Sequence, residues 1–326
     1  MITKQAIVQR CDIISQAHQG MRLDQAVSAV FPEYSRAQLQ KWIKSGELKL
    51  NHKPAKPKDK VKVGDDVMLE ATLVDVTHWL PEKMPLNIIY EDQYILVINK
   101  PANCVVHPAQ GHLTGTLVNA LLEHDAALSL LPRAGLIHRL DKDTTGLLVV
   151  AKTLEAHTRL IQQMQSREIK RVYSALVNGT PLSGATIDLP MGRHPHQRTK
   201  MAVVEEGKPS VTHYKVLEKF ERHTLLKVML ETGRTHQIRV HLSHKKMPVF
   251  GDVLYGARLT LPHGCDENLR ETLTNFKRQA LHAAELVFEH PIIDTKTVSC
   301  NAPLPSDMAA VLQGLRENKQ MQKEKG

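Results

Sequence analysis

The stretch HRLDKDTTGLLVVAK, from His138 to Lys152, places two acids one residue apart and follows them with two threonines, a glycine and an apolar run. Three kinds of site begin with acids in this arrangement. A calcium loop uses the acids as metal ligands, and an aspartyl phosphatase uses the first acid as its nucleophile. A third kind of site sets one carboxylate beside a sugar. The flanking sequence has to distinguish among these three.

The residues after the two acids disfavour both metal-dependent sites. An EF-hand needs a bidentate glutamate at its twelfth position, and counting from Asp141 that position is Lys152. The run GLLVVA predicts a strand, whereas an EF-hand needs a helix there. A phosphatase needs a strand leading into the first acid and later acids to hold magnesium, but here the β-rich run comes afterwards and no acidic cluster follows. The third kind of site, a single carboxylate beside a sugar, remains as an interpretation.

Length and composition predict a globular protein of two domains. The chain has 326 residues, of which 42% are apolar and 24% charged, values that are ordinary for soluble proteins. No apolar run approaches the roughly 18 residues that a membrane span requires. The first residues, MITKQAIVQRCDIISQAHQG, lack the apolar core and cleavage site of a signal peptide. We therefore expect a cytoplasmic protein without a membrane partner.

Cysteine spacing limits the kinds of metal site and cross-link to be expected, and net charge indicates the kind of partner. Four scattered cysteines with no CxxC pair argue against a zinc site and against a disulfide framework. The formal net charge of +9 favours a polyanionic partner such as nucleic acid, although a solvated basic surface would give the same value.

Residues 20 to 70 form a small unit with its own pattern. Apolar residues at helical spacing predict one short helix within 21–31 and a second one after Ser35, which is a good N-cap residue. The following residues, 47–70, alternate and turn like short strands. Between Lys49 and Lys62, six lysines accompany the single acid Asp59 and predict a strongly positive face: Lys49, Lys53, Lys56, Lys58, Lys60 and Lys62.

Two helices followed by a basic β-turn unit resemble the S-four-type RNA-binding module. That family usually carries a glycine after the asparagine of its tight turn, where this chain has Asn51-His52. The resemblance implies RNA binding through one basic face of the unit. The residues expected to contact RNA are Arg22, Arg36, Lys41, Lys44, Lys49 and Lys53.

The remainder of the chain predicts an α+β body. Short β-branched runs alternate with Gly, Pro and a few helical patterns from Ile88 to Pro305. The prolines before Ile88 predict a linker, and the polar residues RENKQMQKEKG, 316–326, predict a disordered end of the chain. The expected division is an RNA-binding domain at 1–80, a linker at 81–87, the body at 88–305 and a polar tail at 306–326.

Five stretches of the body resemble, in order, the motifs of the RluA-type pseudouridine synthases. In the first of them many relatives carry glycine where this chain has Asn103, a residue type that tolerates the left-handed backbone region. The resemblance implies a mixed, mostly antiparallel sheet with flanking helices and a cleft across its middle. The stretches are ILVINKPANCVVHP (95–108), HRLDKDTTGLLVVAK (138–152), IKRVYSALVNG (169–179), ETGRTHQIRVHLSH (231–244) and FGDVLYG (250–256).

The resemblance also implies a reaction and the residues that perform it. Members of this family isomerise uridine to pseudouridine in RNA with no cofactor and no metal, and the chain has neither of the glycine-rich nucleotide loops. Asp141 would supply the carboxylate that acts on a flipped-out uridine, and whether it attacks C6, attacks C1′ or removes a sugar proton stays open. Tyr173 would stack on the base. Arg239, whose fork can bind a carboxylate at two points, would keep Asp141 charged.

Further residues are expected near the substrate. Arg139 would fill the place of the flipped base, or pair with a phosphate, and Asp143 would cap backbone donors of its turn. The other residues expected to bind substrate are His138, Lys142, Lys100, His107, Thr235, His236 and Gln237.

The expected partner is 23S ribosomal RNA, or the precursor of the large ribosomal subunit, with the helix 69 stem-loop as target and a monomeric enzyme. Another ribosomal site, a transfer RNA, or a non-catalytic role in ribosome assembly are the alternatives.

Overall fold

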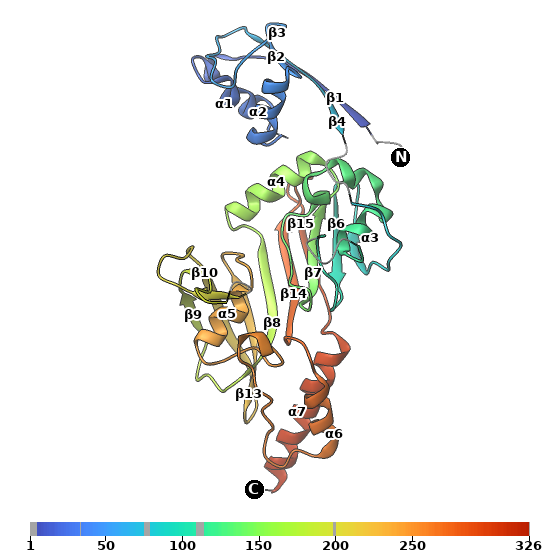
Figure 1. Ribbon diagram of the computed structural model, residues 1–326, viewed down its shortest axis with the longest axis vertical. Helices are drawn as coiled ribbons and strands as arrows, with labels where there is room; N and C mark the ends of the chain where they lie inside the picture. Colours follow the sequence, from blue (N-terminus) through green and yellow to red (C-terminus); the bar gives the residue numbers. More distant parts are fainter. Residues whose placement is uncertain (1–4, 33, 75–78, 109–113, 198–199, 326) are drawn as a thin grey trace.

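The computed structural model describes residues 5–32, 34–74, 79–108, 114–197 and 200–325. A small N-terminal unit lies at one end of a longer α+β body (Figure 1). Its four strands form one sheet in the order β1-β4-β2-β3. Its elements are β1 (Gln5–Ile13), α1 (Leu23–Val30), α2 (Arg36–Ser45), β2 (Leu48–Leu50), β3 (Lys53–Pro54) and β4 (Asp66–Val74).

Both expected helices of the N-terminal unit are confirmed. The Ser35 hydroxyl accepts a hydrogen bond from the backbone N–H of Gln38, which caps α2 as expected. The turn between β2 and β3 forms without a glycine, because Asn51 and His52 both adopt the left-handed conformation, at φ 50° and 62°. The Asn51 side chain then accepts a bond from the backbone N–H of Asp66 and holds the turn. Strand β1 had no recognisable signal, since its polar and apolar residues are mixed and it pairs with β4, far away in the chain.

The body is built around one nine-stranded sheet in the order β5-β6-β7-β14-β8-β13-β12-β9, with β15 also paired to β14. Among the described strands only β7 and β14 pair in parallel, so the expected mixed, mostly antiparallel sheet is confirmed. The strands are β5 (Ile88–Glu91), β6 (Ile95–Lys100), β7 (Thr145–Ala151), β8 (Lys170–Asn178), β9 (Ala185–Asp188), β12 (Val211–Lys219), β13 (His223–Leu230), β14 (Leu281–Glu289) and β15 (Thr297–Asn301). A separate pair is formed by β10 (Met191–Arg193) and β11 (Met201–Val203).

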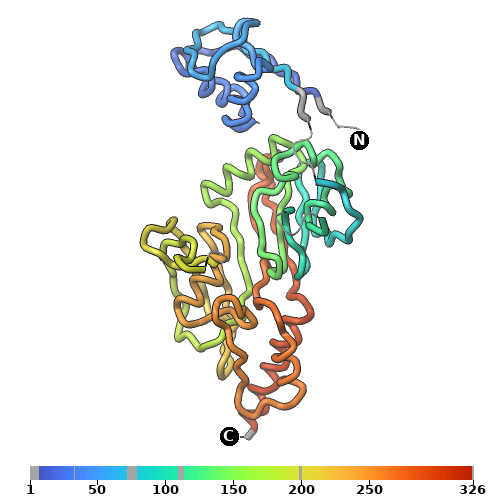
Figure 2. The backbone as a smooth tube through the Cα atoms, viewed as in Figure 1, coloured from blue at the N-terminus to red at the C-terminus, as the bar shows by residue number. Residues whose placement is uncertain are grey.

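Helices cover the sheet and its ends. Figure 1 shows α6 and α7 at the end of the body far from the N-terminal unit, and Figure 2 shows the chain ending there. The helices are α3 (Leu117–His124), α4 (Leu154–Gln165), α5 (Gln237–His244), α6 (Glu267–Asn275) and α7 (Ser306–Lys325). No helix in the described ranges is long and apolar enough to cross a membrane.

Strand β7 explains the apolar run after the acidic loop. All of its residues are buried, because Leu148 and Val150 face one apolar cluster while Leu147 and Val149 face another. Gly146 allows the parallel pairing with β14, since a Cβ there would lie 2.2 Å from the carbonyl oxygen of Ala283. The loop that carries Asp141 therefore leads directly into a strand at the centre of the sheet.

The segment expected as a linker lies on the body. It has no regular structure, but Glu82 accepts a hydrogen bond from the N–H of Gly115 at 2.7 Å, and Asn119 of α3 donates to the carbonyl of Leu80 at 2.7 Å. Trp79 packs against the main core of the body. These contacts attach the segment to α3.

The expectation of a disordered polar tail is wrong, because residues 306–325 form helix α7. Met308, Val311, Leu312 and Leu315 recur at the spacing of one helical face and are all buried, in the same cluster as residues of α6. These four apolar residues leave the segment polar on average, so its composition does not reveal the helix. The apolar face stabilises the helix only where a second surface is present to cover it.

Replacing Leu312 by alanine tests this docking. The side chain is fully buried, so we expect the free energy of unfolding, measured with urea, to fall by about 2–5 kcal/mol. The exposed neighbour Gln313 is the control, and Gln313→Ala should stay within about 0.5 kcal/mol of the wild type. Equal values for both variants would mean that α7 is not docked in solution.

Candidate active site

One cleft of about 550 Å³ opens between the loop that carries Asp141, the start of β8 and the loop that leads into α5. It brings together the three residues expected to be catalytic, Asp141, Tyr173 and Arg239. They come from a loop, a strand and a helix that are far apart in the sequence. Five other residues expected to bind substrate also line it: His138, Arg139, Thr235, His236 and Gln237.

Asp141 is held at the edge of the cleft by Arg239, with His236 beside it. Arg239 donates from Nη1 to Asp141 Oδ2 at 2.9 Å, and His236 Nε2 lies 3.8 Å from Oδ1. The Asp141 side chain is 16% exposed, so one face of the carboxylate is open to a ligand.

Arg239 is fixed mainly by Asp252, an acid that was not expected at the site. It binds Asp252 at two points, from Nε to Oδ2 at 2.6 Å and from Nη2 to Oδ1 at 2.9 Å. The fork of Arg239 therefore binds Asp252 at two points, and only Nη1 is left for Asp141. Burial lowers the pKa of Arg239, but Asp252 and Asp141 more than offset this and raise it above its ordinary value. Asp252 lies in the stretch 250–256, whose likeness to a family motif was the available signal.

Tyr255 joins the same network from the short helix Val253–Tyr255. Its ring centroid lies 5.0 Å from the guanidinium carbon of Arg239, and its hydroxyl is 2.7 Å from His236 Nδ1. Burial lowers the pKa of His236. Tyr255 therefore supports both of the residues that flank Asp141.

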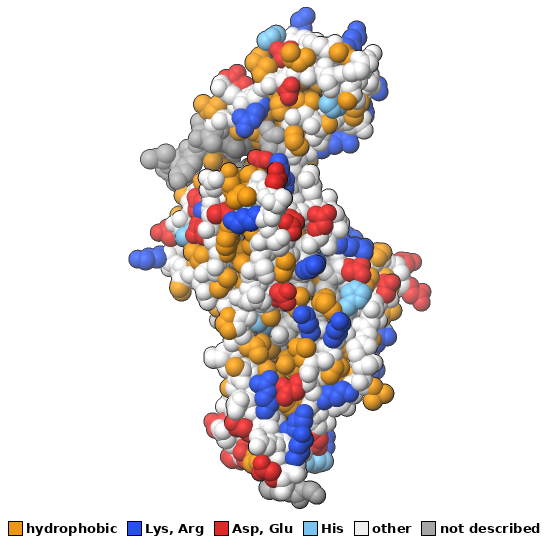
Figure 3. Space-filling view, turned by 180° about the vertical axis from the view of Figure 1, so that it is seen from behind, with side chains coloured by type: hydrophobic (Ala, Val, Ile, Leu, Met, Phe, Trp, Pro, Cys, Tyr) orange, Lys and Arg blue, Asp and Glu red, His pale blue; other side chains and the backbone are white. Residues whose placement is uncertain are grey.

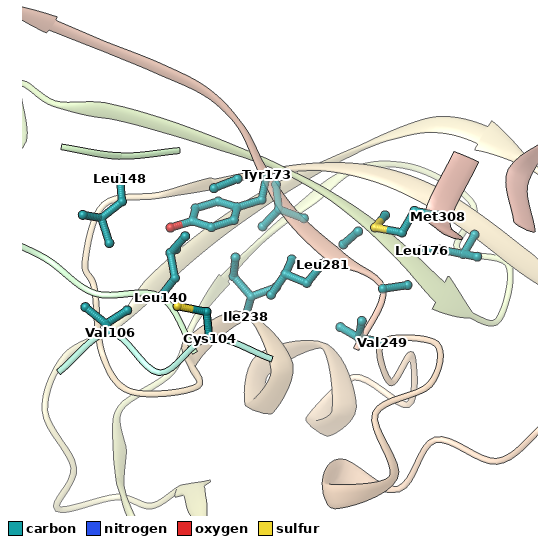
Figure 4. Close-up of a cluster of buried hydrophobic side chains, with 14 of the residues drawn as sticks. Cys104, Val106, Leu140, Leu148, Tyr173, Leu176, Ile238, Val249, Leu281 and Met308 are labelled. Carbon is teal, nitrogen blue, oxygen red and sulfur yellow. The ribbon is translucent and has the colours of Figure 1, made fainter. Parts of the chain in front are cut away.

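Tyr173 forms an apolar wall of the cleft together with Leu140, Ile238 and Leu281. Figure 4 shows its ring within the main core, between Leu148 on one side and Leu281 on the other, with Leu140 close to it. Burial raises the pKa of Tyr173, and Asp141 adds to this while Arg171 opposes it. The phenol is thus neutral, and its ring suits a planar uncharged partner such as a base.

Several residues expected at the substrate support the loops around the cleft. Burial lowers the pKa of His138 to about 3, and its neutral ring accepts a bond from the N–H of Val149. Gln237 donates to Val211 and Thr212 at 3.0 Å and accepts from Thr232 and Arg234. These bonds use both ends of its amide, so Gln237 shapes the loop.

Three other expected residues lie outside the cleft. Lys100 is 1% exposed, and its ammonium donates to the carbonyls of Pro101, Cys104 and Lys142, while burial lowers its pKa to about 8. The expectation that Lys100 binds substrate does not match this position, since its three donors join two loops. Lys142 is exposed away from the cleft, and the His107 ring packs edge-on against Trp79.

The turn chemistry expected beside Asp141 is confirmed. The backbone N–H of Asn103 donates to Asp143 Oδ1 at 3.2 Å, and Asn103 has the left-handed conformation at φ 57°. Asp143 therefore fixes the loop between β6 and α3 against the loop that carries Asp141.

In the N-terminal unit the buried Asp24 forms ion pairs with two of the expected RNA-binding residues. Asp24 is fully buried and binds Arg22 at 3.0 Å and Arg36 at 2.7 Å. Both arginine side chains nevertheless stay about half exposed, at 44% and 47%. Lys41, Lys44 and Lys53 are exposed and Lys49 is partly buried.

Basic side chains also surround the cleft itself. Among the described residues, six arginines and two acids, Asp141 and Glu231, line it, and four of the arginines were not anticipated. Figure 3 shows further Lys and Arg side chains on the far face of the body and on the N-terminal unit. Within the described ranges, no three His, Cys, Asp or Glu side chains are grouped so as to hold a metal ion. The unanticipated arginines are Arg133, Arg167, Arg171 and Arg234.

Comparison with known proteins accounts for both parts of the chain. Residues 94–244 match the family described as RNA pseudouridylate synthase, and residues 21–67 match the S4 domain. The human protein "RNA Pseudouridylate Synthase Domain Containing 4" superposes with a TM-score of 0.54 at 26% identity, over 71% of this chain and 93% of that one.

Two bacterial relatives share about half of their residues with this chain. Ribosomal large subunit pseudouridine synthase D of Pseudomonas aeruginosa is 51% identical over 301 residues, which cover 92% of this chain and 94% of the relative. The protein of the same name from Escherichia coli is 47% identical over 310 residues, which cover 95% of each. This chain therefore belongs to the RNA pseudouridylate synthase family, and its enzymatic class is that of an isomerase.

Proposed function

We propose that this protein converts uridine to pseudouridine in the 23S RNA of the large ribosomal subunit, with the helix 69 stem-loop as its target. The observation that carries the proposal is the Asp141 carboxylate, open to the cleft and held by an arginine that Asp252 anchors. The relatives that share about half of their residues with this chain are named for the large ribosomal subunit.

The reaction needs few groups, and the cleft offers them. The N1–C1′ bond breaks, the uracil turns, a C5–C1′ bond forms, and the C5 proton leaves while N1 gains one. Nothing is oxidised or consumed. Asp141 supplies the carboxylate that acts on the nucleoside, and Arg239 holds it in place with a hydrogen bond to Oδ2.

The apolar wall is suited to hold the uracil while it is detached. Tyr173 presents a neutral aromatic ring, and Leu140, Ile238 and Leu281 exclude water beside it. A stacked uridine must first be flipped out at a cost of a few kcal/mol. Arg139 is exposed at the rim and would fill the vacated place in the RNA.

The N-terminal unit would bind the same RNA through its basic face. Asp24 orients Arg22 and Arg36 while leaving their guanidinium groups accessible, so less side-chain entropy is lost on binding. The exposed lysines of α2 add charge that attracts phosphates.

The proposal is tested by mapping pseudouridines at single-nucleotide resolution in RNA from cells that lack the gene. The cells are rescued with the wild type or with Asp141→Asn. Marks in the helix 69 loop that return only with the wild type would establish both activity and target. Marks that vanish elsewhere, while those of helix 69 persist, would overturn the target and keep the activity.

Removing two lysines tests the role of the N-terminal unit. We expect Lys41→Gln combined with Lys44→Gln to weaken RNA binding and to reduce the slope of log affinity against log salt by about 0.7–0.9 for each phosphate that the protein no longer neutralises. The matched control replaces Lys277 and Lys323, which are exposed on the body. An unchanged slope in the α2 variant would show that this face is merely solvated.

A further inference from the structure

Arg171 is a buried cation to which the described residues offer no partner. It lies on β8 two positions before Tyr173, so both side chains leave the same face of the strand and enter the cleft. The residue is 8% exposed, and its buried Nε finds no acceptor among the residues that the structure describes. Within the described part of the chain, its guanidinium has no hydrogen bond and no ion pair. Leaving a buried charge unpaired is costly, which indicates that its partner comes from outside the protein.

The acids of the cleft are already occupied. Asp141 pairs with Arg239, whereas Glu231 pairs with Arg167 and lies 2.8 Å from His213 Nε2. Neither of these two described carboxylates has an ion pair with Arg171. The neighbouring Arg234 and Arg167 also line this part of the cleft and increase its attraction for an anion.

Gly233 leaves room for the Arg171 guanidinium. A Cβ at position 233 would lie 2.8 Å from Arg171 Nη1, closer than real Cβ atoms come to a neighbour. Any side chain at this position would push the guanidinium aside. The loop that approaches Arg171 is thus shaped to keep this charge in the cleft.

We propose that Arg171 binds a backbone phosphate of the RNA next to the flipped uridine, in a subsite bordered by Gly233 and Arg234. This inference rests on the proposed function. The guanidinium has no anionic partner among the described residues, and a phosphate would supply a full negative charge. Two phosphate oxygens also fit the planar fork of the guanidinium, whereas a uracil carbonyl is neutral. Bound in this way, the phosphate anchors the sugar on the side of Tyr173, so Arg171 positions the nucleotide for Asp141.

The test combines a protein variant with a substrate variant. Stem-loop RNAs each carry one neutral methylphosphonate near the target uridine, and wild type is compared with Arg171→Gln for kcat/KM and Kd. For the wild-type enzyme, kcat/KM on one of these RNAs should be lower than on the unmodified RNA by on the order of 10²-fold. Arg171→Gln should lose as much on unmodified RNA and nothing further on that same neutral RNA. Arg159, an arginine of α4 whose side chain is 40% exposed and pairs with Glu155, is the control, and Arg159→Gln should keep the full sensitivity.

Two further variants separate phosphate binding from a structural role. Gly233→Ala should displace the guanidinium and reproduce the loss at the same phosphate. Arg171→Met should unfold at the same temperature as the wild type or higher, since it removes an unpaired buried charge.

The proposal is overturned if the losses from Arg171→Gln and from every methylphosphonate multiply independently, or if Arg171→Met lowers the unfolding temperature by many degrees. If the wild type binds the stem-loop but forms no pseudouridine, the proposed function fails. The coupling measured in Kd then still decides the role of Arg171.

Discussion

The Asp141→Asn variant is expected to lose pseudouridine formation by on the order of 10³-fold or more, the scale seen when one member of a catalytic unit is removed. Asparagine has nearly the same shape, so the cleft stays intact, but its neutral amide can neither attack a carbon nor take a proton. RNA affinity should stay within a few-fold, because the groups that bind phosphates are untouched. Release of tritium from RNA labelled at uridine C5 measures the loss directly.

Asp143 provides the matched control for that result. It lies two residues away and accepts a backbone hydrogen bond from Asn103, which an amide oxygen can still accept. Asp143→Asn should therefore keep activity within about 10-fold, since one hydrogen bond contributes roughly 1 kcal/mol. Tritium release by Asp141→Asn at the rate of this control would remove Asp141 from the proposed role.

The second large effect is expected at Asp252. Its replacement by alanine takes away two of the three hydrogen bonds that Arg239, whose side chain is 7% exposed, donates to acids. We expect the free energy of unfolding, measured with urea, to fall by about 3–5 kcal/mol, because a buried charge loses its partner. The remaining bond to Asp141 no longer fixes the guanidinium, so kcat should fall by on the order of 10²-fold.

An exposed ion pair offers a like-for-like comparison. Glu218 binds Arg316 at 2.8 Å near the surface, with side chains that are 27% and 47% exposed. Glu218→Ala should lower the free energy of unfolding by about 1 kcal/mol or less and leave the rate unchanged. If Asp252→Ala behaves like Glu218→Ala, the buried network does not hold Arg239 in solution.

Local patterns in the sequence were sufficient for many elements of the structure. The helical periods of α1 and α2, the N-cap at Ser35, the left-handed Asn103 and the strand after the acidic loop each depend on a few adjacent residues. Their conformations follow from backbone sterics and side-chain spacing, which are visible in the chain itself. The motif around Asp141 is likewise a short run of adjacent residues that can be recognised in the sequence.

Other features depend on contacts between distant segments. Strand β1 exists because β4 pairs with it, and α7 is stable because the body covers its narrow apolar stripe. Periodicity within either segment could not reveal the surface that the other supplies. For the same reason the polar composition of residues 306–326 was misleading.

The sequence by itself determined the family, the motif around Asp141 and the kinds of side chain available to the site. Only the tertiary structure decided how their charges pair: Arg239 with Asp252 at two points, Lys100 with three carbonyls, and Arg171 with no group in the described part of the chain. The physical reason is that a charge buried by folding takes the partner that the fold brings within about 3 Å, wherever that partner lies in the chain.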